Sequence, residues 1–232
     1  MNQFLFGAMP YILLTIAVVG TIWRFTTNRY SWSSQSSQFL ENKTLFFGSV
    51  PWHYGILTVL FFHILGFFIP SAILGWNAEP TRLYIFEIGG LSFGILAFFG
   101  LLMLIYRRFT NVRIKSVTSG WDAIVLLILF IQIITGLANA IMFRWGSNWY
   151  AATAVPWMWS VITMAPEVDR VGNLHWITKV HIFNALLFFA FIPFSRLAHF
   201  IVINPYKYLW RPYQVVRWYS REPRTANIVQ YK

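Results

Sequence analysis

The sequence predicts an all-α integral membrane protein with five transmembrane helices. Hydrophobic residues make up 57% of its 232 residues and charged residues only 11%, a balance that does not suit a soluble surface. Five apolar segments are each long enough to cross a hydrocarbon core of about 30 Å as a helix. They cover residues 4–23, 51–70, 83–106, 121–143 and 174–203.

The first segment, 4–23, is expected to be a retained helix, because it lacks the basic start and the small-residue cleavage site of a signal peptide. Turn and charge signals follow the second and third segments, as "NAEPTR" and "RRFTNVRIKSVTSG". No soluble domain fits between the segments. Residues 1–203 are therefore predicted to form one transmembrane domain, and 204–232 a basic, aromatic cytoplasmic tail that contacts a partner subunit.

The distribution of positive charge predicts the orientation. The net charge is +11, and with the N-terminus outside, most Lys and Arg residues fall on the inner side, whereas the outer connections hold only Arg82, Arg144 and Arg170. The sequence thus predicts a multi-pass protein of the inner (plasma) membrane, N-out and C-in. Such an excess of positive charge also suits contact with anionic membrane lipid, and nothing else in the sequence supports binding of nucleic acid.

The chain has no cysteine, which excludes iron–sulfur clusters, thiolate zinc sites and covalent c-type haem. Histidine is therefore the residue type to consider as a metal ligand. His53 and His63 lie in the second segment, and His181 and His199 in the fifth, whereas His175 lies just before the fifth. The rise within each helix would be about 15 Å and about 27 Å. Each of the two helices therefore carries one histidine towards each side of the membrane.

The second and fifth helices are three crossings apart and must run antiparallel. This predicts two pairs, His53 with His199 on the inner side and His63 with His181 on the outer side. Two facing imidazoles at each of two depths are what bis-histidine ligation of two b-type haems requires. The alternatives are four isolated hydrogen-bonded histidines, or a haem-free transporter that passes a metal ion, although ionisable residues inside a membrane favour function over filler.

Several motifs resemble one family. "HYGILTVLFFHILG", "WSVITM", "KVH" and "FIPFSRLAHF", with "SSQ" in the first inner loop and "TSGWD" before the fourth helix, are similar to the gamma subunit of respiratory nitrate reductase, a membrane cytochrome b. The resemblance implies two haem b groups, with quinol oxidised beside the outer, His63 and His181 haem and electrons passed inward. It also implies two partners, a cytoplasmic iron–sulfur subunit and a molybdenum catalytic subunit.

A cytochrome b of the same superfamily that serves another cytoplasmic redox module, linked to sulfite reduction or heterodisulfide chemistry, remains an alternative. For the quinol site, the resemblance points to Arg82, near the start of the third helix. Arg82 could equally be an interfacial anchor. Glu87, an acid at membrane depth, could accept a quinol proton or pair with Arg82 or Lys179.

Arg196 lies one helical turn before His199, where its guanidinium could bind a haem propionate. Arg24, Arg107 and Arg108 are weaker candidates for the same role. Phe62, directly before the second ligand, stands where related chains can have a small residue, and so bears on the shape of the quinol pocket. Three further features have two interpretations each: Gly55 and Gly66 could admit a macrocycle or pack helices, and 145–164 could roof the quinol pocket or form an aromatic belt.

Overall fold

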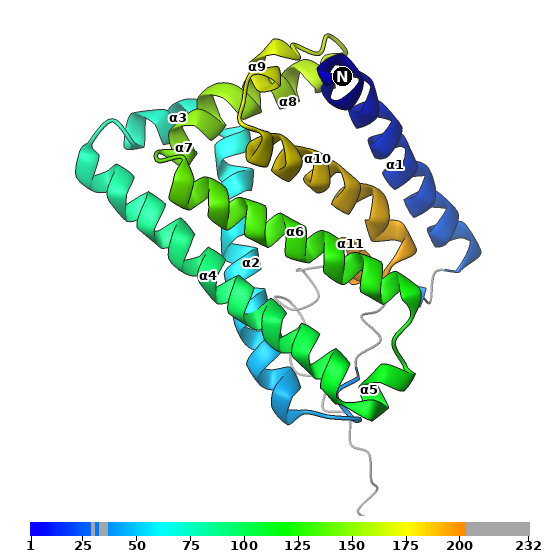
Figure 1. Cartoon of the computed structure of the whole chain (residues 1–232). Coiled ribbons are helices and arrows are strands. Elements are labelled where there is room, and N and C mark those ends of the chain that lie inside the picture. The colour runs from blue at the N-terminus through cyan, green and yellow to red at the C-terminus, as the bar shows by residue number, and fades with distance from the viewer. Residues whose placement is uncertain (29–30, 33–36, 203–232) are drawn as a thin grey trace, which may run out of the picture. The chain divides into compact units, whose positions relative to one another are not determined.

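The computed structural model describes residues 1–28, 31–32 and 37–202, and within them every regular element is helical (Figure 1). Residues Met1–His199 form one compact unit. It contains five helices that are long and apolar enough to cross a membrane: Phe4–Thr27, Lys43–Phe68, Pro80–Thr110, Gly120–Met142 and Trp176–Phe194. The predicted all-α fold with five membrane spans is confirmed, whereas the predicted tail, 204–232, lies outside the described residues.

Shorter helical turns connect the spans or extend them. The elements in chain order are η1 (Phe4–Ala8), α1 (Met9–Thr27), α2 (Lys43–Phe68), α3 (Pro70–Trp76), α4 (Pro80–Thr110), α5 (Val112–Ser116), α6 (Gly120–Met142), α7 (Gly146–Trp149), η3 (Tyr150–Ala154), α8 (Val155–Ile162), α9 (Asp169–Gly172), α10 (Trp176–Phe191), η4 (Ile192–Phe194), η5 (Arg196–Ala198) and α11 (His199–Val202).

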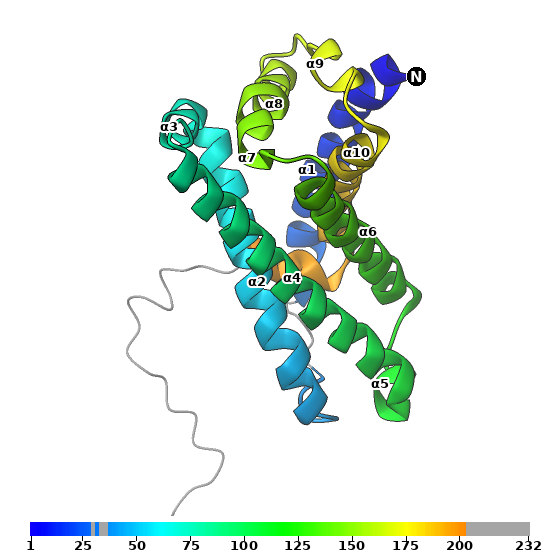
Figure 2. The same ribbon diagram turned by 60° about the vertical axis from the view of Figure 1, so that its left-hand side comes forward.

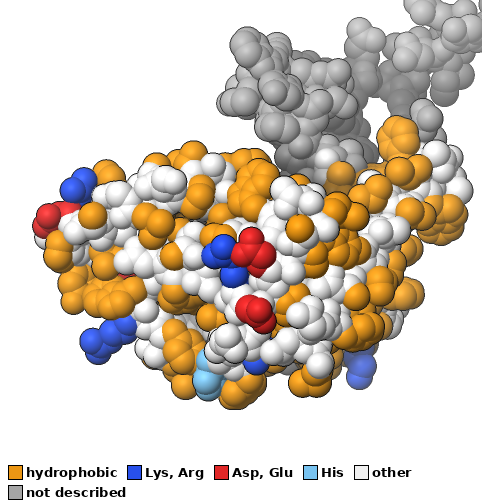
Figure 3. Space-filling view, turned by 90° about the horizontal axis from the view of Figure 1, so that it is seen from above, with side chains coloured by type: hydrophobic (Ala, Val, Ile, Leu, Met, Phe, Trp, Pro, Cys, Tyr) orange, Lys and Arg blue, Asp and Glu red, His pale blue; other side chains and the backbone are white. Residues whose placement is uncertain are grey.

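The unit Met1–His199 has two distinct ends (Figures 1 and 2). The N-terminus, α3, α7, α8 and α9 gather at one, called here the α8 end, and α5 and the start of α2 lie at the other, the α5 end. A buried cluster of Phe6, Trp157, Val161, Val168 and Val171 joins the N-terminus to α8 and α9. Seen from the α8 end, few charged side chains stand among many hydrophobic ones (Figure 3).

Glycines bring α2 and α4 into backbone contact. A Cβ on Gly100 would lie 2.3 Å from the Trp52 backbone nitrogen, and a Cβ on Gly55 would lie 2.4 Å from the Ala97 backbone nitrogen. Small residues allow such an approach, which helices in lipid use because no hydrophobic effect drives them together. Of the two interpretations of Gly55, helix packing is therefore the one that the structure supports.

The second helix begins earlier than its hydropathy predicts, at Lys43 and not near Pro51, which lies inside it. The Glu41 carboxylate accepts hydrogen bonds from the backbone N–H groups of Thr44, at 2.6 Å, and Leu45, and from the guanidinium of Arg107. Burial raises the pKa of Glu41, but these bonds outweigh it and hold the pKa below its usual value. The first turn of α2 is charged and hydrogen-bonded, so a search for apolar residues does not predict it.

The fifth helix is shorter than the predicted span 174–203. Regular α-helix ends at Phe191, and two 3-10 turns flank Ser195, whose backbone is extended (φ −127°, ψ 176°). Pro193 interrupts the helix because it lacks an N–H and clashes with the preceding turn. The Arg24 guanidinium donates to the carbonyl oxygens of Pro193, at 2.6 Å, and Ser195, at 2.7 Å. The acceptors freed by the break are thereby satisfied from α1.

We expect Gly100→Ala to destabilise the protein by about 1–3 kcal/mol, because the new Cβ would overlap the backbone of α2 and the two helices would have to separate. Gly90→Ala, on the same helix but with open space around the new Cβ, is the matched control and should be neutral. Thermal unfolding in detergent measures both. Equal melting temperatures would show that α2 and α4 do not depend on this contact.

Candidate functional site

The predicted pair at the α5 end comes together. The rings of His53, on α2, and His199, which follows η5, have centroids 6.5 Å apart with an interplanar angle of 64°. Two imidazoles bonded at about 2 Å to opposite sides of one metal ion would have ring centres about 6 Å apart. The observed separation fits a shared axial metal.

The second predicted pair lies nearer the α8 end. His63 lies on α2 and His181 on α10. A Cβ on Gly136 of α6 would lie 3.0 Å from Cε1 of His181, so this glycine leaves room for the ring. The side chains of His53 and His63 are exposed although both lie in the middle of an apolar helix. Open surface therefore adjoins these rings.

Three of the four rings share one hydrogen-bond pattern. Nδ1 lies 2.7 Å from the Ser49 carbonyl in His53, 2.8 Å from the Val59 carbonyl in His63, and 2.7 Å from the Arg196 carbonyl in His199. A carbonyl oxygen can only accept, so in each ring Nδ1 carries the proton and donates it. The other nitrogen, Nε2, is then left with a lone pair, as a metal ligand requires.

His181 reaches the same state through a side chain on another helix. Its Nδ1 lies 3.0 Å from Oγ1 of Thr135, on α6, and that hydroxyl donates its own proton to the Ile131 carbonyl at 2.6 Å. Thr135 must therefore accept from the His181 Nδ1–H, and Nε2 again holds a lone pair. The Gln132 side-chain amide nitrogen lies 3.1 Å from that Nε2 and donates a hydrogen bond to its lone pair.

The fifth histidine differs from the other four. Nδ1 of His175 accepts a hydrogen bond from the backbone N–H of Ile177 and so caps the start of α10. Its proton therefore lies on Nε2, the opposite arrangement. The ring packs beside Phe143 and Trp176. His175 is a helix cap, in agreement with its place outside the two predicted pairs.

Sequence reasoning missed the polar ladder that joins α6 to α10 around His181. The Asn184 amide donates to Gln132 Oε1 at 2.7 Å, and Thr178 Oγ1 donates to Asn139 Oδ1 at 2.5 Å. All of its members face the helix contact within apolar segments: Gln132, Thr135 and Asn139 on α6, with Thr178, His181 and Asn184 on α10. Their spacing of three or four residues on each helix was the signal that could have found them.

An aromatic segment lies against α2 at the α8 end. The Tyr150 ring packs 5.1 Å from that of His63 and rests on Gly66, and its hydroxyl donates to the His63 carbonyl at 2.9 Å. Burial raises the pKa of Tyr150 to about 12, so the hydroxyl stays a donor at neutral pH. Trp159 stacks on Phe67 and donates to its carbonyl. Two residues of the segment 145–164, Tyr150 and Trp159, therefore pack against α2 at His63 and Phe67.

The two predicted quinol-site residues have structural contacts of their own. Glu87 accepts hydrogen bonds from the backbone N–H groups of Gly146 and Ser147, and its carboxylate thus caps α7. The exposed Arg82 stacks its guanidinium over Trp76, 5.3 Å from the ring. The Lys179 ammonium donates to the Gly172 carbonyl. Glu87 thus contacts α7, and roles in quinol binding for Arg82 and Glu87 stay predictions.

The arginines at the α5 end form ion pairs and hydrogen bonds between separate segments of the chain. Arg107 is 4% exposed and binds Ser37 and Glu41, while Arg108 and Arg196 both pair with Asp122. A role for Arg196 at a haem propionate stays a prediction. Phe62, the residue before His63, packs on Phe86 of α4, with ring centroids 4.7 Å apart.

The residues present fit two bis-imidazole haems. Nδ1 of each of the four rings lies beside an acceptor, and the rings of His53 and His199 lie 6.5 Å apart. The described residues contain no group of three or more His, Cys, Asp or Glu that could hold a bare metal ion. Haem iron in an electron-transfer cytochrome takes two axial ligands and its other four from the macrocycle. Paired rings, rather than a cluster, are the arrangement that such a group needs.

Comparison with known proteins identifies the family of the chain. The profile of the family described as "Nitrate reductase gamma subunit" matches residues 2–219. The chain belongs to the nitrate reductase gamma subunit family. It is accordingly a multi-pass membrane protein, and the resemblance noted from its sequence motifs is confirmed.

Relatives of this family match over nearly the whole chain. The nitrate reductase gamma chain of Bacillus subtilis is 34% identical, over 93% of this chain and 98% of its own length. The respiratory nitrate reductase 2 gamma chain of Escherichia coli is 29% identical, over 94% and 97%. A more distant match, 22% identical over 85% of this chain and 75% of its own, is the Hdr-like menaquinol oxidoreductase cytochrome b-like subunit of Archaeoglobus profundus.

We expect Thr178→Val to cost about 1–3 kcal/mol of stability, because it leaves the buried Asn139 carbonyl oxygen without its donor. Thr58→Val removes a hydroxyl that donates to the Tyr54 carbonyl at an exposed position of α2, and should change stability by no more than about 0.5 kcal/mol. Thermal unfolding compares the two. A larger loss in Thr58→Val would contradict the assignment of the ladder as the stabilising contact.

Proposed function

We propose that this chain is a dihaem cytochrome b subunit that oxidises quinol and passes the electrons to a cytoplasmic nitrate reductase. His53 and His199 would hold one haem b iron, and His63 and His181 the other. When bound, the haems would supply one-electron transfer across the bilayer. The observation that carries the proposal is the shared hydrogen-bond pattern, in which Nδ1 of each ring lies beside an acceptor and Nε2 is left unprotonated, together with the close approach of the His53 and His199 rings.

The direction of the reaction follows from the predicted orientation. With the N-terminus outside, the α8 end is the outer end, and a quinol bound there near His63 would release its protons outward while electrons move inward. Moving a charge across the membrane potential is worth about 2.3 kcal/mol per 100 mV, so the separation conserves energy without a proton pump. Tyr150 and Trp159 would hold the wall of this outer site in place.

The partners follow from the family. We expect a cytoplasmic iron–sulfur subunit and a molybdenum catalytic subunit to bind at the inner, α5 end. The Archaeoglobus relative is described as part of a menaquinol oxidoreductase of a different type, which keeps a second acceptor module in view. Purification in mild detergent, with identification of the co-purifying subunits, decides between the two.

The pairing of ligands is the sharpest test of the haem arrangement. We expect His63→Ala and His181→Ala to remove the same haem, and His53→Ala and His199→Ala to remove the other, because an axial site left empty weakens retention of that group alone. Reduced-minus-oxidised spectra and redox titration of each variant distinguish the two haems. His175→Ala is the control and should keep both.

Two outcomes would overturn the arrangement. Loss of the same haem from His53→Ala and His181→Ala would contradict the pairing. A purified wild-type chain without a dithionite-reducible b-type spectrum would remove the haem proposal altogether and favour the alternative of a metal transporter.

Thr135 supplies a second test, specific to one haem. Thr135→Val removes the acceptor for the His181 Nδ1–H, and we expect haem affinity at the His63 and His181 site to fall about 10–100-fold. Thr135→Ser keeps the hydroxyl and should restore it. Haem titration of the apoprotein measures the affinity, and an equal loss from the His53 and His199 site would mean that Thr135 acts through the fold and not through His181.

A further inference from the structure

Of the four histidines, only His199 has no regular α-helix directly before it. His53, His63 and His181 lie inside α2 and α10, where the helical hydrogen bonds on either side fix the backbone. His199 follows η4, the extended Ser195 and the 3-10 turn η5. Its direction must therefore be set by contacts from other elements.

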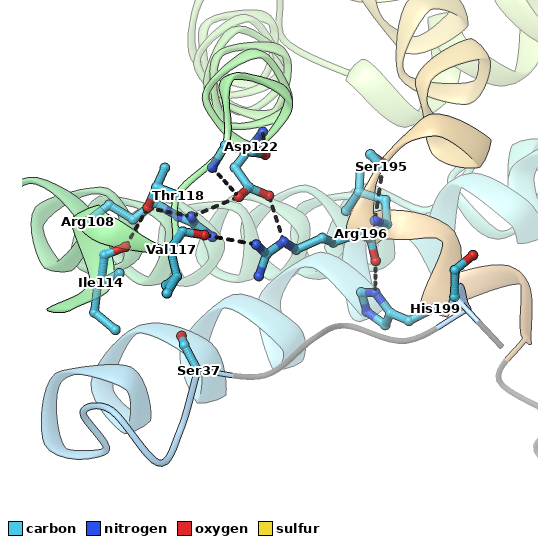
Figure 4. A network of polar contacts seen from close by, with 12 residues as sticks. Ser37, Arg108, Ile114, Val117, Thr118, Asp122, Ser195, Arg196 and His199 are labelled. Carbon is cyan, nitrogen blue, oxygen red and sulfur yellow. Dashed lines mark hydrogen bonds and ion pairs between the residues drawn. The ribbon is translucent and has the colours of Figure 1, made fainter.

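Asp122, in the first turn of α6, contacts Arg196, which lies three residues before His199 (Figure 4). The carboxylate is 7% exposed, and its Oδ1 lies 2.9 Å from Nε of Arg196. Its Oδ2 accepts from the Ser119 backbone N–H at 3.0 Å and from Arg108 at 3.3 Å. A second guanidinium nitrogen of Arg196 donates to the Val117 carbonyl at 3.1 Å. The Arg196 side chain is thus fixed to the start of α6 at two points.

The main chain of Arg196 in turn fixes the ligand. Its carbonyl oxygen accepts the Nδ1–H of His199 at 2.7 Å, the bond that leaves Nε2 of that ring with a lone pair. The ring lies 6.5 Å from that of His53. The side chain of one residue is therefore held by Asp122 while its backbone orients the imidazole. A chain of contacts runs from α6 to the ring.

We propose that Asp122, acting through Arg196, is a positioning residue for His199. Hydrogen bonds between charged groups are roughly twice as strong as neutral ones, and the planar guanidinium fork restricts orientation as well as distance. This ion pair takes the place that a continuous helix takes for the other three ligands. The inference rests on the proposed haem function. It assigns Asp122 to the inner haem site, which the positions of the four histidines alone do not reveal.

The same residues allow a competing role, in which Arg196 binds a haem propionate and Asp122 matters little. The two roles predict different results. If Asp122 positions the ligand through Arg196, then Asp122→Asn and Arg196→Gln perturb the same haem to a similar degree, and the double variant adds nothing further. If Arg196 binds a propionate directly, Arg196→Gln perturbs that haem and Asp122→Asn does not.

The experiment measures haem content, the redox potential of each haem and the low-spin electron paramagnetic resonance signal in the purified full-length chain. We expect both single variants to lower affinity for the His53 and His199 haem about 10–100-fold and to shift its signal, with the other haem unchanged. Glu167→Gln, which breaks an exposed ion pair with Arg170 near the α8 end, is the matched control and should leave both haems as in the wild type.

Asp122 also caps α6 with Ser119, so Asp122→Asn could fail to fold. Arg196→Gln keeps that cap intact, and Arg108→Gln removes the other cation of Asp122 while keeping the Arg196 pair. Arg196→Gln should perturb the inner haem and Arg108→Gln should not. Unaltered spectra in both Asp122→Asn and Arg196→Gln would overturn the inference. A wild-type chain without haem would instead overturn the proposed function, so the two failures are distinguishable.

Discussion

The protonation of four imidazoles is the constraint on which the candidate site depends. A histidine becomes a metal ligand at Nε2 only if its proton lies on Nδ1, and in lipid that proton needs an acceptor within the protein. Two rings use a carbonyl four residues earlier on their own helix, His199 uses one three residues earlier, and His181 uses a hydroxyl on α6.

Two different kinds of helix contact support the helices that carry these rings. Glycines let the backbones of α2 and α4 touch, which gives His53 and His63 a stiff support without a polar group. Polar side chains join α6 to α10, where the ladder around Thr135 and Asn184 also selects the protonation of His181. The first contact fixes position, and the second fixes position and chemistry together.

The sequence predicted the five spans, the approach of His53 to His199 and the family, because hydropathy and the spacing of a rare residue type survive as one-dimensional patterns. It could not predict partners that depend on three-dimensional approach. Arg196 pairs with Asp122, from the separate motif "TSGWD", and Phe62 turns to Phe86 on α4. Hydropathy also did not predict the early start of α2, because Glu41 and Lys43 are charged and lower the local hydropathy. Glu41 nevertheless stabilises the first turn.

The break in the fifth helix resolves a mismatch that straight helices would leave. His53 and His63 are separated by about 15 Å of helical rise, whereas His181 and His199 would be separated by about 27 Å on a continuous helix, so both pairs could not face each other at equal depth. The interruption at Pro193 removes His199 from the helical register and allows its ring to come within 6.5 Å of the His53 ring. The carbonyls that the break frees must be satisfied away from water, and Arg24 does this from α1. The geometry of the His53 and His199 pair therefore rests on one proline and on the charged side chains that compensate for it.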